Sequence, residues 1–128
     1  MSAIRGFRDL QVYQLARAEA RRLFEVTQSF PKSETYSLND QVRRFSRAVN
    51  AMLAEGWGRR RYEAAFINKV SEALGEAMET QAWLDHALDC GYLTEAQFQQ
   101  MDSAWQEIGA KLNGIIAKAA SFCPKPDH

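Results

Sequence analysis

The chain has 128 residues, 46% of them hydrophobic and 25% charged, which is the composition of one globular domain. It has no apolar run near the roughly 18–20 residues of a membrane span, and its N-terminus lacks the apolar core of a signal peptide. Without such a span, we expect no contact with a membrane. Cys90 and Cys123 are too few for a disulfide framework, so we expect a cytoplasmic protein.

The formal net charge is zero, but it is the sum of two opposed halves. Residues 1–61 hold twelve Arg and Lys against six Asp and Glu, a balance of +6. Residues 62–128 hold four against ten, a balance of −6. Such polarity is typical of a protein that meets copies of itself or a polyanion.

Hydrophobic spacings of three and four residues predict two helices in the first half of the chain. The first begins after Asp9 as N-cap and runs to about Ser29. The second follows a capping box of Ser37 and Asp40, and 56–58, Gly-Trp-Gly, breaks it. The predicted core stripes are Tyr13, Ala16, Ala20, Leu23, Phe24 and Thr27, then Leu38, Val42, Phe45, Val49, Met52 and Gly56.

Two further helices are predicted in the second half. One spans about 61–90, and Gly91 follows it at the position where glycine commonly ends a helix. The other begins after a capping box formed by Thr94 and Gln97. Their core stripes are Phe66, Val70, Ala73, Ala77, Leu84 and Leu88, then Phe98, Met101, Trp105, Ile108, Leu112, Ile115, Ala119 and Phe122.

Four amphipathic helices with short connections predict an all-α fold, an antiparallel up-and-down four-helix bundle over residues 1–122. A three-helix core with one detached helix is the alternative. Residues 123–128 are expected to form a disordered tail.

Apolar residues outside the core stripes predict a homo-oligomer, because apolar rows on two faces of a helix mean two buried faces. These residues are Ile67, Leu74 and Met78 on the third helix, and Val12, Leu15 and Val26 on the first. A basic side of one subunit facing an acidic side of the next would supply complementarity, for a ring or for a dimer.

Arginines carry the main functional hypothesis, because guanidinium groups bind phosphates bidentately. Arg59, Arg60 and Arg61 lie near the junction of the second and third helices, flanked by Trp57 and Tyr62, which would stack on unpaired bases. A second group is predicted to support this RNA- or DNA-binding surface. It consists of Arg43, Arg44 and Arg47.

The alternative is a scaffold whose arginines are used in structural ion pairs. Arg43 or Arg44 would then pair with carboxylates of the third helix, within one chain or across an interface. The candidate partners are Glu72, Glu76 and Glu79, and Glu55 is a further acid expected to need a partner.

The sequence predicts no catalytic residue, cofactor, metal or small-molecule substrate. No Ser or Cys stands in a recognisable setting with a base, and the Glu-x-x-His motifs of a di-iron bundle are absent. His86 and Cys90 lie one turn apart, but two ligands from one helix are a weak signal for a metal site. We therefore expect a protein that is not an enzyme.

Short stretches in a fixed order across residues 7–93 resemble a known family, the small four-helix-bundle proteins encoded in 23S rRNA intervening sequences, once labelled S23 ribosomal proteins. The stretches are Phe7-Arg8-Asp9-Leu10-Gln11-Val12-Tyr13-Gln14, Phe30-Pro31 with Glu34 and Tyr36, Gln41-Val42-Arg43-Arg44, Leu53-Ala54-Glu55-Gly56, Glu79-Thr80-Gln81 and Gly91-Tyr92-Leu93. The chain departs from the family pattern at Ser37, at 48–52, where a usual proline is absent, and at Ala77.

The resemblance implies a bundle that assembles as a ring, often a pentamer. It also implies similarity to accessory proteins of diversity-generating retroelements, which bind nucleic acid through a basic surface.

Overall fold

The computed structural model describes residues 3–125, and all four of its long elements are helices, with no strand in that range. The long helices are α1 (Gln11–Thr27), α2 (Leu38–Gly58), α3 (Glu63–Asp89) and α4 (Glu95–Ala117). Short 3-10 turns are η1 (Phe7–Asp9), η2 (Lys32–Glu34) and η3 (Ala119–Ser121). Of the predicted tail, 126–128 lie outside the described residues, whereas Cys123 packs half-buried against the core.

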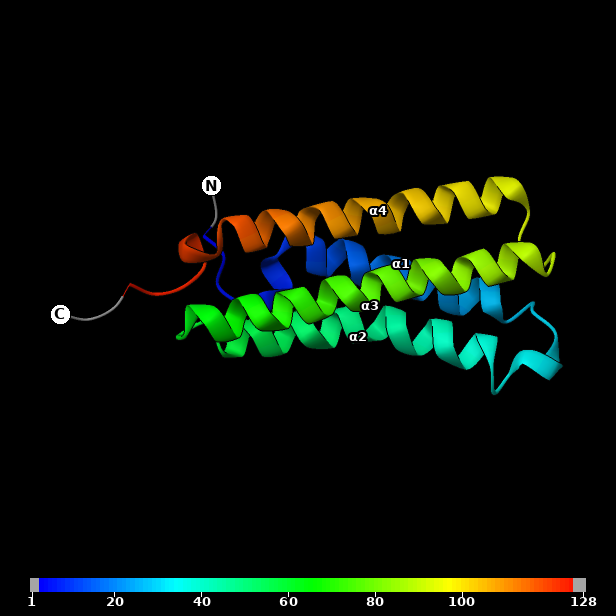
Figure 1. The fold of residues 1–128 in the computed structure, drawn as a ribbon, viewed down its shortest axis with the longest axis horizontal. Coiled ribbons are helices and arrows are strands. Elements are labelled where there is room, and N and C mark those ends of the chain that lie inside the picture. The colour runs from blue at the N-terminus through cyan, green and yellow to red at the C-terminus, as the bar shows by residue number, and fades with distance from the viewer. Residues whose placement is uncertain (1–2, 126–128) are drawn as a thin grey trace.

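Successive helices run in opposite directions along the bundle (Figure 1). The contacts between α1 and α2 follow this order, because Asn50 Nδ2 donates to the Tyr13 carbonyl and Arg43 Nε donates to Thr27 Oγ1. Residues that come later in α1 therefore meet residues that come earlier in α2. The predicted all-α four-helix bundle is confirmed.

The core lies along most of the stripes predicted for α3 and α4, but Leu88, Phe98 and Phe122 are half-buried, and Ala87 takes the buried place near the end of α3. On α4 the buried residues are Met101, Trp105, Ile108, Leu112 and Ile115. The stripes of the first two helices are partly wrong, because Val12 is buried in the chain's own core while Phe24 is 37% exposed. On α2, Leu53 takes the fully buried place and Met52 is half-buried.

Gly56 lets α2 and α3 approach each other closely. A Cβ at this position would lie 3.1 Å from the Lys69 Cβ and 3.7 Å from the Phe66 carbonyl oxygen. The helix continues through Gly56 and ends at Gly58, so the predicted break is wrong at Gly56. Glycine suits this position because a Cβ would force Lys69 to shift by a few tenths of an ångström.

The predicted caps of α1 and α2 are also wrong. Asp9 Oδ2 accepts hydrogen bonds from the backbone N–H groups of Arg5 (2.8 Å) and Gly6 (3.2 Å), so it closes η1 and does not cap α1. The Ser37 hydroxyl donates to Glu34 and makes no side-chain cap on α2. In both places a nearer polar group competes for the capping side chain.

The predicted caps between α3 and α4 are confirmed. Gly91 has a φ of 76°, and the bond from the Tyr92 N–H to the Ala87 carbonyl (2.9 Å) completes the helix end. Thr94 Oγ1 accepts from the Gln97 N–H at 3.1 Å, and Gln97 Oε1 accepts from the Thr94 N–H at 2.9 Å.

The loops at this end of the bundle are tied to each other. Tyr92 Oη donates to Glu34 Oε2 at 2.9 Å, and the rings of Tyr92 and Phe30 lie 5.3 Å apart. Hydrogen bonds from the Ser37 hydroxyl and then from Tyr92 lower the pKa of the Glu34 carboxyl. The segment between α1 and α2 is thereby held against the loop between α3 and α4.

Glu19 is a carboxylate buried in the wall of the bundle. It is 5% exposed, its Oε1 has no hydrogen-bond partner among residues 3–125, and its Oε2 lies 3.8 Å from Arg22 Nη2. Burial raises the pKa of this carboxyl, Arg22 opposes the rise, and Glu107 adds to it. The ionised form of Glu19 therefore destabilises the folded protein.

Glu19→Gln is expected to raise the midpoint temperature of unfolding near pH 7, because the neutral amide avoids burying a charge. A pKa raised by folding penalises the native state fully above the folded pKa and not at all below the usual value of 4.5. The gain should therefore shrink as the pH falls towards that value.

Thermal unfolding of the wild type, Glu19→Gln and the exposed control Glu25→Gln from about pH 4 to about pH 8 measures this difference. A Glu19→Gln variant that is less stable near neutral pH, or equally stabilised at every pH, would contradict the account.

Candidate nucleic-acid interface

The arginines that were predicted to act together lie in two separate places. Arg43, Arg44 and Arg47 lie in the N-terminal half of α2, whereas Arg59 begins the segment beyond its C-terminal end. At a rise of about 1.5 Å per residue, Arg44 and Arg59 are roughly 22 Å apart along the helix. The single surface expected from sequence is not assembled.

α1 brings further arginines to the N-terminal half of α2. Arg17 and Arg21, one turn apart on α1, line a groove of about 350 Å³ together with Arg47. A second hollow shares Arg47 and is lined by the other arginines of α2 and by Tyr36. We call these two hollows, which share Arg47, the basic groove; its arginines are Arg17, Arg21, Arg43, Arg44 and Arg47.

The sequence held a signal for these missed residues. Arg17, Arg21 and Phe24 recur at spacings of four and three, which places them on one face of a helix. Only the antiparallel pairing of α1 with α2 shows that this face lies beside Arg47.

Arg43 is fixed in position by neutral partners. Its Nε donates to Thr27 Oγ1 at 2.8 Å, its Nη2 donates to the Phe24 carbonyl at 3.5 Å, and its guanidinium carbon lies 4.7 Å from the centre of the Phe24 ring. The guanidinium of Arg47 lies 5.5 Å from the same ring. These contacts orient both side chains without cancelling their charge.

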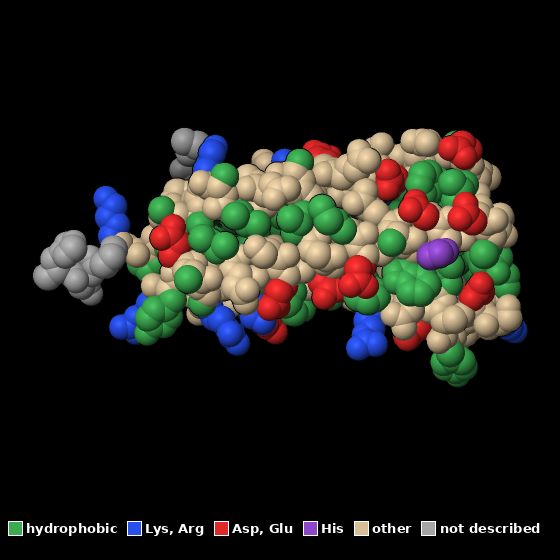
Figure 2. Space-filling view, viewed as in Figure 1, with side chains coloured by type: hydrophobic (Ala, Val, Ile, Leu, Met, Phe, Trp, Pro, Cys, Tyr) green, Lys and Arg blue, Asp and Glu red, His purple; other side chains and the backbone are tan. Residues whose placement is uncertain are grey.

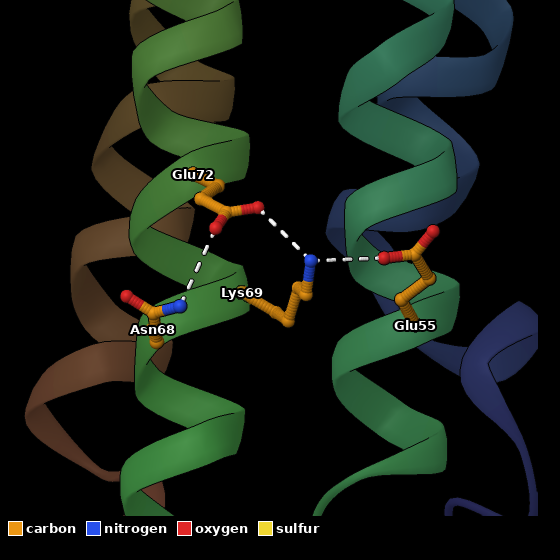
Figure 3. Close-up of polar contacts among 4 residues, drawn as sticks. All are labelled: Glu55, Asn68, Lys69 and Glu72. Atoms are coloured by element: carbon orange, nitrogen blue, oxygen red, sulfur yellow. Dashed lines mark hydrogen bonds and ion pairs between the residues drawn. The ribbon is translucent and has the colours of Figure 1, made fainter.

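The predicted pairing of Arg43 or Arg44 with carboxylates of α3 is not formed within the chain. Among residues 3–125, the ion pairs of α2 and α3 centre on Lys69, which is 16% exposed and lies 3.0 Å from Glu55 Oε2 and 3.1 Å from Glu72 Oε2 (Figure 3). These bonds raise the pKa of Lys69. Glu55 and Glu72 thus pair with a lysine, and not with the arginine that was predicted as the partner of Glu72.

The two remaining predicted acids, Glu76 and Glu79, form no ion pair among the described residues. Burial first, and then Glu79 and Glu72, raise the pKa of the Glu76 carboxyl, and Arg44 opposes that rise. Arg44 is exposed beside this row, so its predicted partnership across a subunit interface stays a prediction.

The Arg59–Arg61 segment turns onto its own aromatic side chains. The Arg60 guanidinium carbon lies 4.1 Å from the centre of the Trp57 ring system, and its Nη1 donates to the Trp57 carbonyl at 3.0 Å. Arg61 lies 5.8 Å from the centre of the Tyr62 ring. Each ring predicted to stack on bases therefore has an arginine over one face.

Charge is segregated over the surface of the bundle. On the face formed by α3 and α4, Asp and Glu side chains are spread across the surface and Lys and Arg lie at its edges (Figure 2).

Among the described residues, no three His, Cys, Asp or Glu side chains are placed to hold a metal ion. None of the helices in this range has the length and apolarity of a membrane span.

Comparison with known proteins agrees with this fold. The family model of the 23S rRNA-intervening sequence protein matches residues 8–114. The chain is similar to the crystal structure of a protein with unknown function from the S23 ribosomal protein family of Bacteroides thetaiotaomicron VPI-5482, with a TM-score of 0.74 and 25% identity, covering 83% of this chain and 95% of that chain. No curated protein matches. The chain belongs to the 23S rRNA-intervening sequence protein family.

Proposed function

We propose that this protein binds RNA or DNA through the basic groove. The observation that carries the proposal is that acidic side chains neutralise few of the arginines in the groove. Among these arginines, Arg21 alone forms an ion pair within residues 3–125. Its partner, Glu25, is 61% exposed at the side chain, and such a surface pair contributes little. The proposed role is binding without catalysis, in the cytoplasm.

Two features suit the groove to a phosphate backbone. Arginines from two helices face one hollow, so several phosphates can be contacted at once, and each contact releases counterions. Arg43 and Arg47 are already oriented by Phe24, which reduces the side-chain entropy lost on binding. Asp40, which lines the second hollow, is the acid that opposes this charge.

The arginines beyond α2 are proposed as a secondary contact. Arg59 and Arg61 are exposed, but Arg60 is half-buried and bonded to Trp57. We therefore assign the main binding energy to the groove.

The double variant Arg17→Gln/Arg47→Gln is expected to weaken RNA and DNA binding by roughly tenfold or more at low salt. The slope of log K against log salt should also fall by about 1.4–1.8, which corresponds to two lost phosphate contacts. Fluorescence anisotropy with labelled oligonucleotides across a salt series measures both quantities.

The matched control is Arg59→Gln/Arg61→Gln, which removes the same charge from the other surface. Equal losses in the two variants would show that net charge alone matters, and no loss in the groove variant would contradict the proposal.

We also propose that the protein self-associates through the outer side of α3. Met78 is 57% exposed, and Ile67 and Leu74 beside it on α3 are only half-buried. Leu74 lies against Gly109 of α4, and hydrophobic side chains form a band along this face (Figure 2). Burial of this band against a second copy would remove apolar surface from water. The pentameric ring implied by the family resemblance is one such assembly.

Met78→Lys is expected to dissociate the assembly, because it places a charge in an apolar contact. Sedimentation equilibrium should give a multiple of 14.6 kDa for the wild type and for the control Gln100→Lys, and 14.6 kDa for Met78→Lys. A wild-type chain of 14.6 kDa at every concentration would overturn this proposal.

A further inference from the structure

Tyr36 is an aromatic side chain that the bundle leaves in solvent. It is 94% exposed, and it lies at the end of the basic groove that Arg43, Arg44 and Arg47 line. A buried tyrosine would add considerable apolar burial to the core, so the folded chain gains little from this ring. Its position beside the arginines indicates a role in what the groove binds.

We infer that the basic groove takes unpaired nucleotides and that a base stacks on the Tyr36 ring. This inference rests on the proposed function and deepens it, because it names single-stranded RNA or DNA as the substrate class. An aromatic ring beside cationic groups is the arrangement that binds single strands, since every base has a face that can stack.

The segment that carries Tyr36 is well supported. The Ser37 N–H donates to the Glu34 carbonyl at 3.1 Å, and the Thr35 N–H donates to the Lys32 carbonyl, also at 3.1 Å. Glu34 is in turn bonded to Tyr92 across the end of the bundle. The exposed ring is therefore presented from a hydrogen-bonded turn, which lowers the cost of ordering it on binding.

The rings elsewhere in the groove are less open to a base. Phe24 has the guanidinium groups of Arg43 and Arg47 over it, and Tyr13 is half-buried with the Phe7 ring 5.0 Å away. Tyr36 has no aromatic or cation–ring contact among the described residues. It is thus the ring of the groove with a free face.

The groove has the reach of a short strand. Positions 40 to 50 of α2 span roughly 15 Å, which is long enough for a few successive nucleotides. Bases inside a duplex are stacked on one another and cannot reach Tyr36, so a duplex would gain only the phosphate contacts. Asp40 lies in the same hollow and would disfavour a phosphate at its own position, while its carboxylate can accept a hydrogen bond from a base amine.

The test uses the full chain with a labelled strand of about 12 nucleotides, as RNA and as DNA, each single-stranded and annealed to its complement. Single strands are expected to bind more tightly than duplexes. Tyr36→Ala should weaken single-strand binding by roughly 5- to 150-fold, the range of one base–aromatic stack, and leave duplex binding unchanged. Tyr36→Phe should retain wild-type affinity, because the ring remains.

Tyr62→Ala is the matched control, since Tyr62 is 65% exposed but lies beside Arg61, away from the groove. Its affinity should fall far less than that of Tyr36→Ala, because the segment beyond α2 is only the proposed secondary contact and Arg61 lies over the Tyr62 ring. The RNA and DNA arms show which sugar the groove accepts.

Duplex binding as tight as single-strand binding, or unchanged affinity of Tyr36→Ala, would overturn the inference. The proposed function would survive that result if Arg17→Gln/Arg47→Gln still lost affinity, and would fall if that variant bound like the wild type. A lower molar mass of Tyr36→Ala with unchanged affinity would also overturn the inference, because it would make Tyr36 a subunit contact.

Discussion

Two side-chain hydrogen bonds fix the register of α1 against α2, and the surface of the protein depends on that register. Asn50 Nδ2 donates to the Tyr13 carbonyl at 3.0 Å near one end of the pair, and Arg43 Nε donates to Thr27 Oγ1 at 2.8 Å near the other. Thr27 is buried and its own hydroxyl bonds to the Leu23 carbonyl, so the acceptor is rigid. This register places the arginines of α1 beside those of α2.

Two of the acids near these charges are engaged by a lysine, whereas Glu76 and Glu79 form no ion pair among the described residues. Lys69 binds Glu55 and Glu72, which holds two carboxylates in an ion-pair cluster between α2 and α3. The groove is left with like charges close together, and self-repulsion of this kind destabilises a compact state. The proposed binding of a polyanion would account for a surface that costs stability, because binding sites often trade stability for function.

The sequence correctly predicts those parts of the fold that depend on residues close together in the chain. The regular spacing of α4, the capping box at Thr94 and the helix end at Gly91 depend on near neighbours, and all are confirmed. Gly56 was misread because its role depends on a residue of another helix, Lys69, rather than on the local backbone.

The candidate site was harder to predict for the same reason. Arg17 and Arg21 become part of it only through their pairing with a helix that follows a loop, and spacing within α1 cannot show this. One of the expected partners of Arg44, Glu72, is bound by Lys69, which lies three residues away on the same helix. Competition between cations for the same acid depends on side-chain reach in three dimensions.

The central claim is that acids do not cancel the positive charge of the basic groove. The most direct test of this claim is the stability of Arg17→Gln as a function of ionic strength. Arg17 is exposed and forms no ion pair among residues 3–125, and glutamine has nearly the same helix propensity. Urea unfolding at low salt should show the variant to be more stable than the wild type, by about 0.2–0.5 kcal/mol from the Arg17–Arg21 repulsion alone, with a gap that closes as salt screens the charges. A variant that is less stable at low salt would show that Arg17 is paired with an acid, and the account of the groove would be wrong.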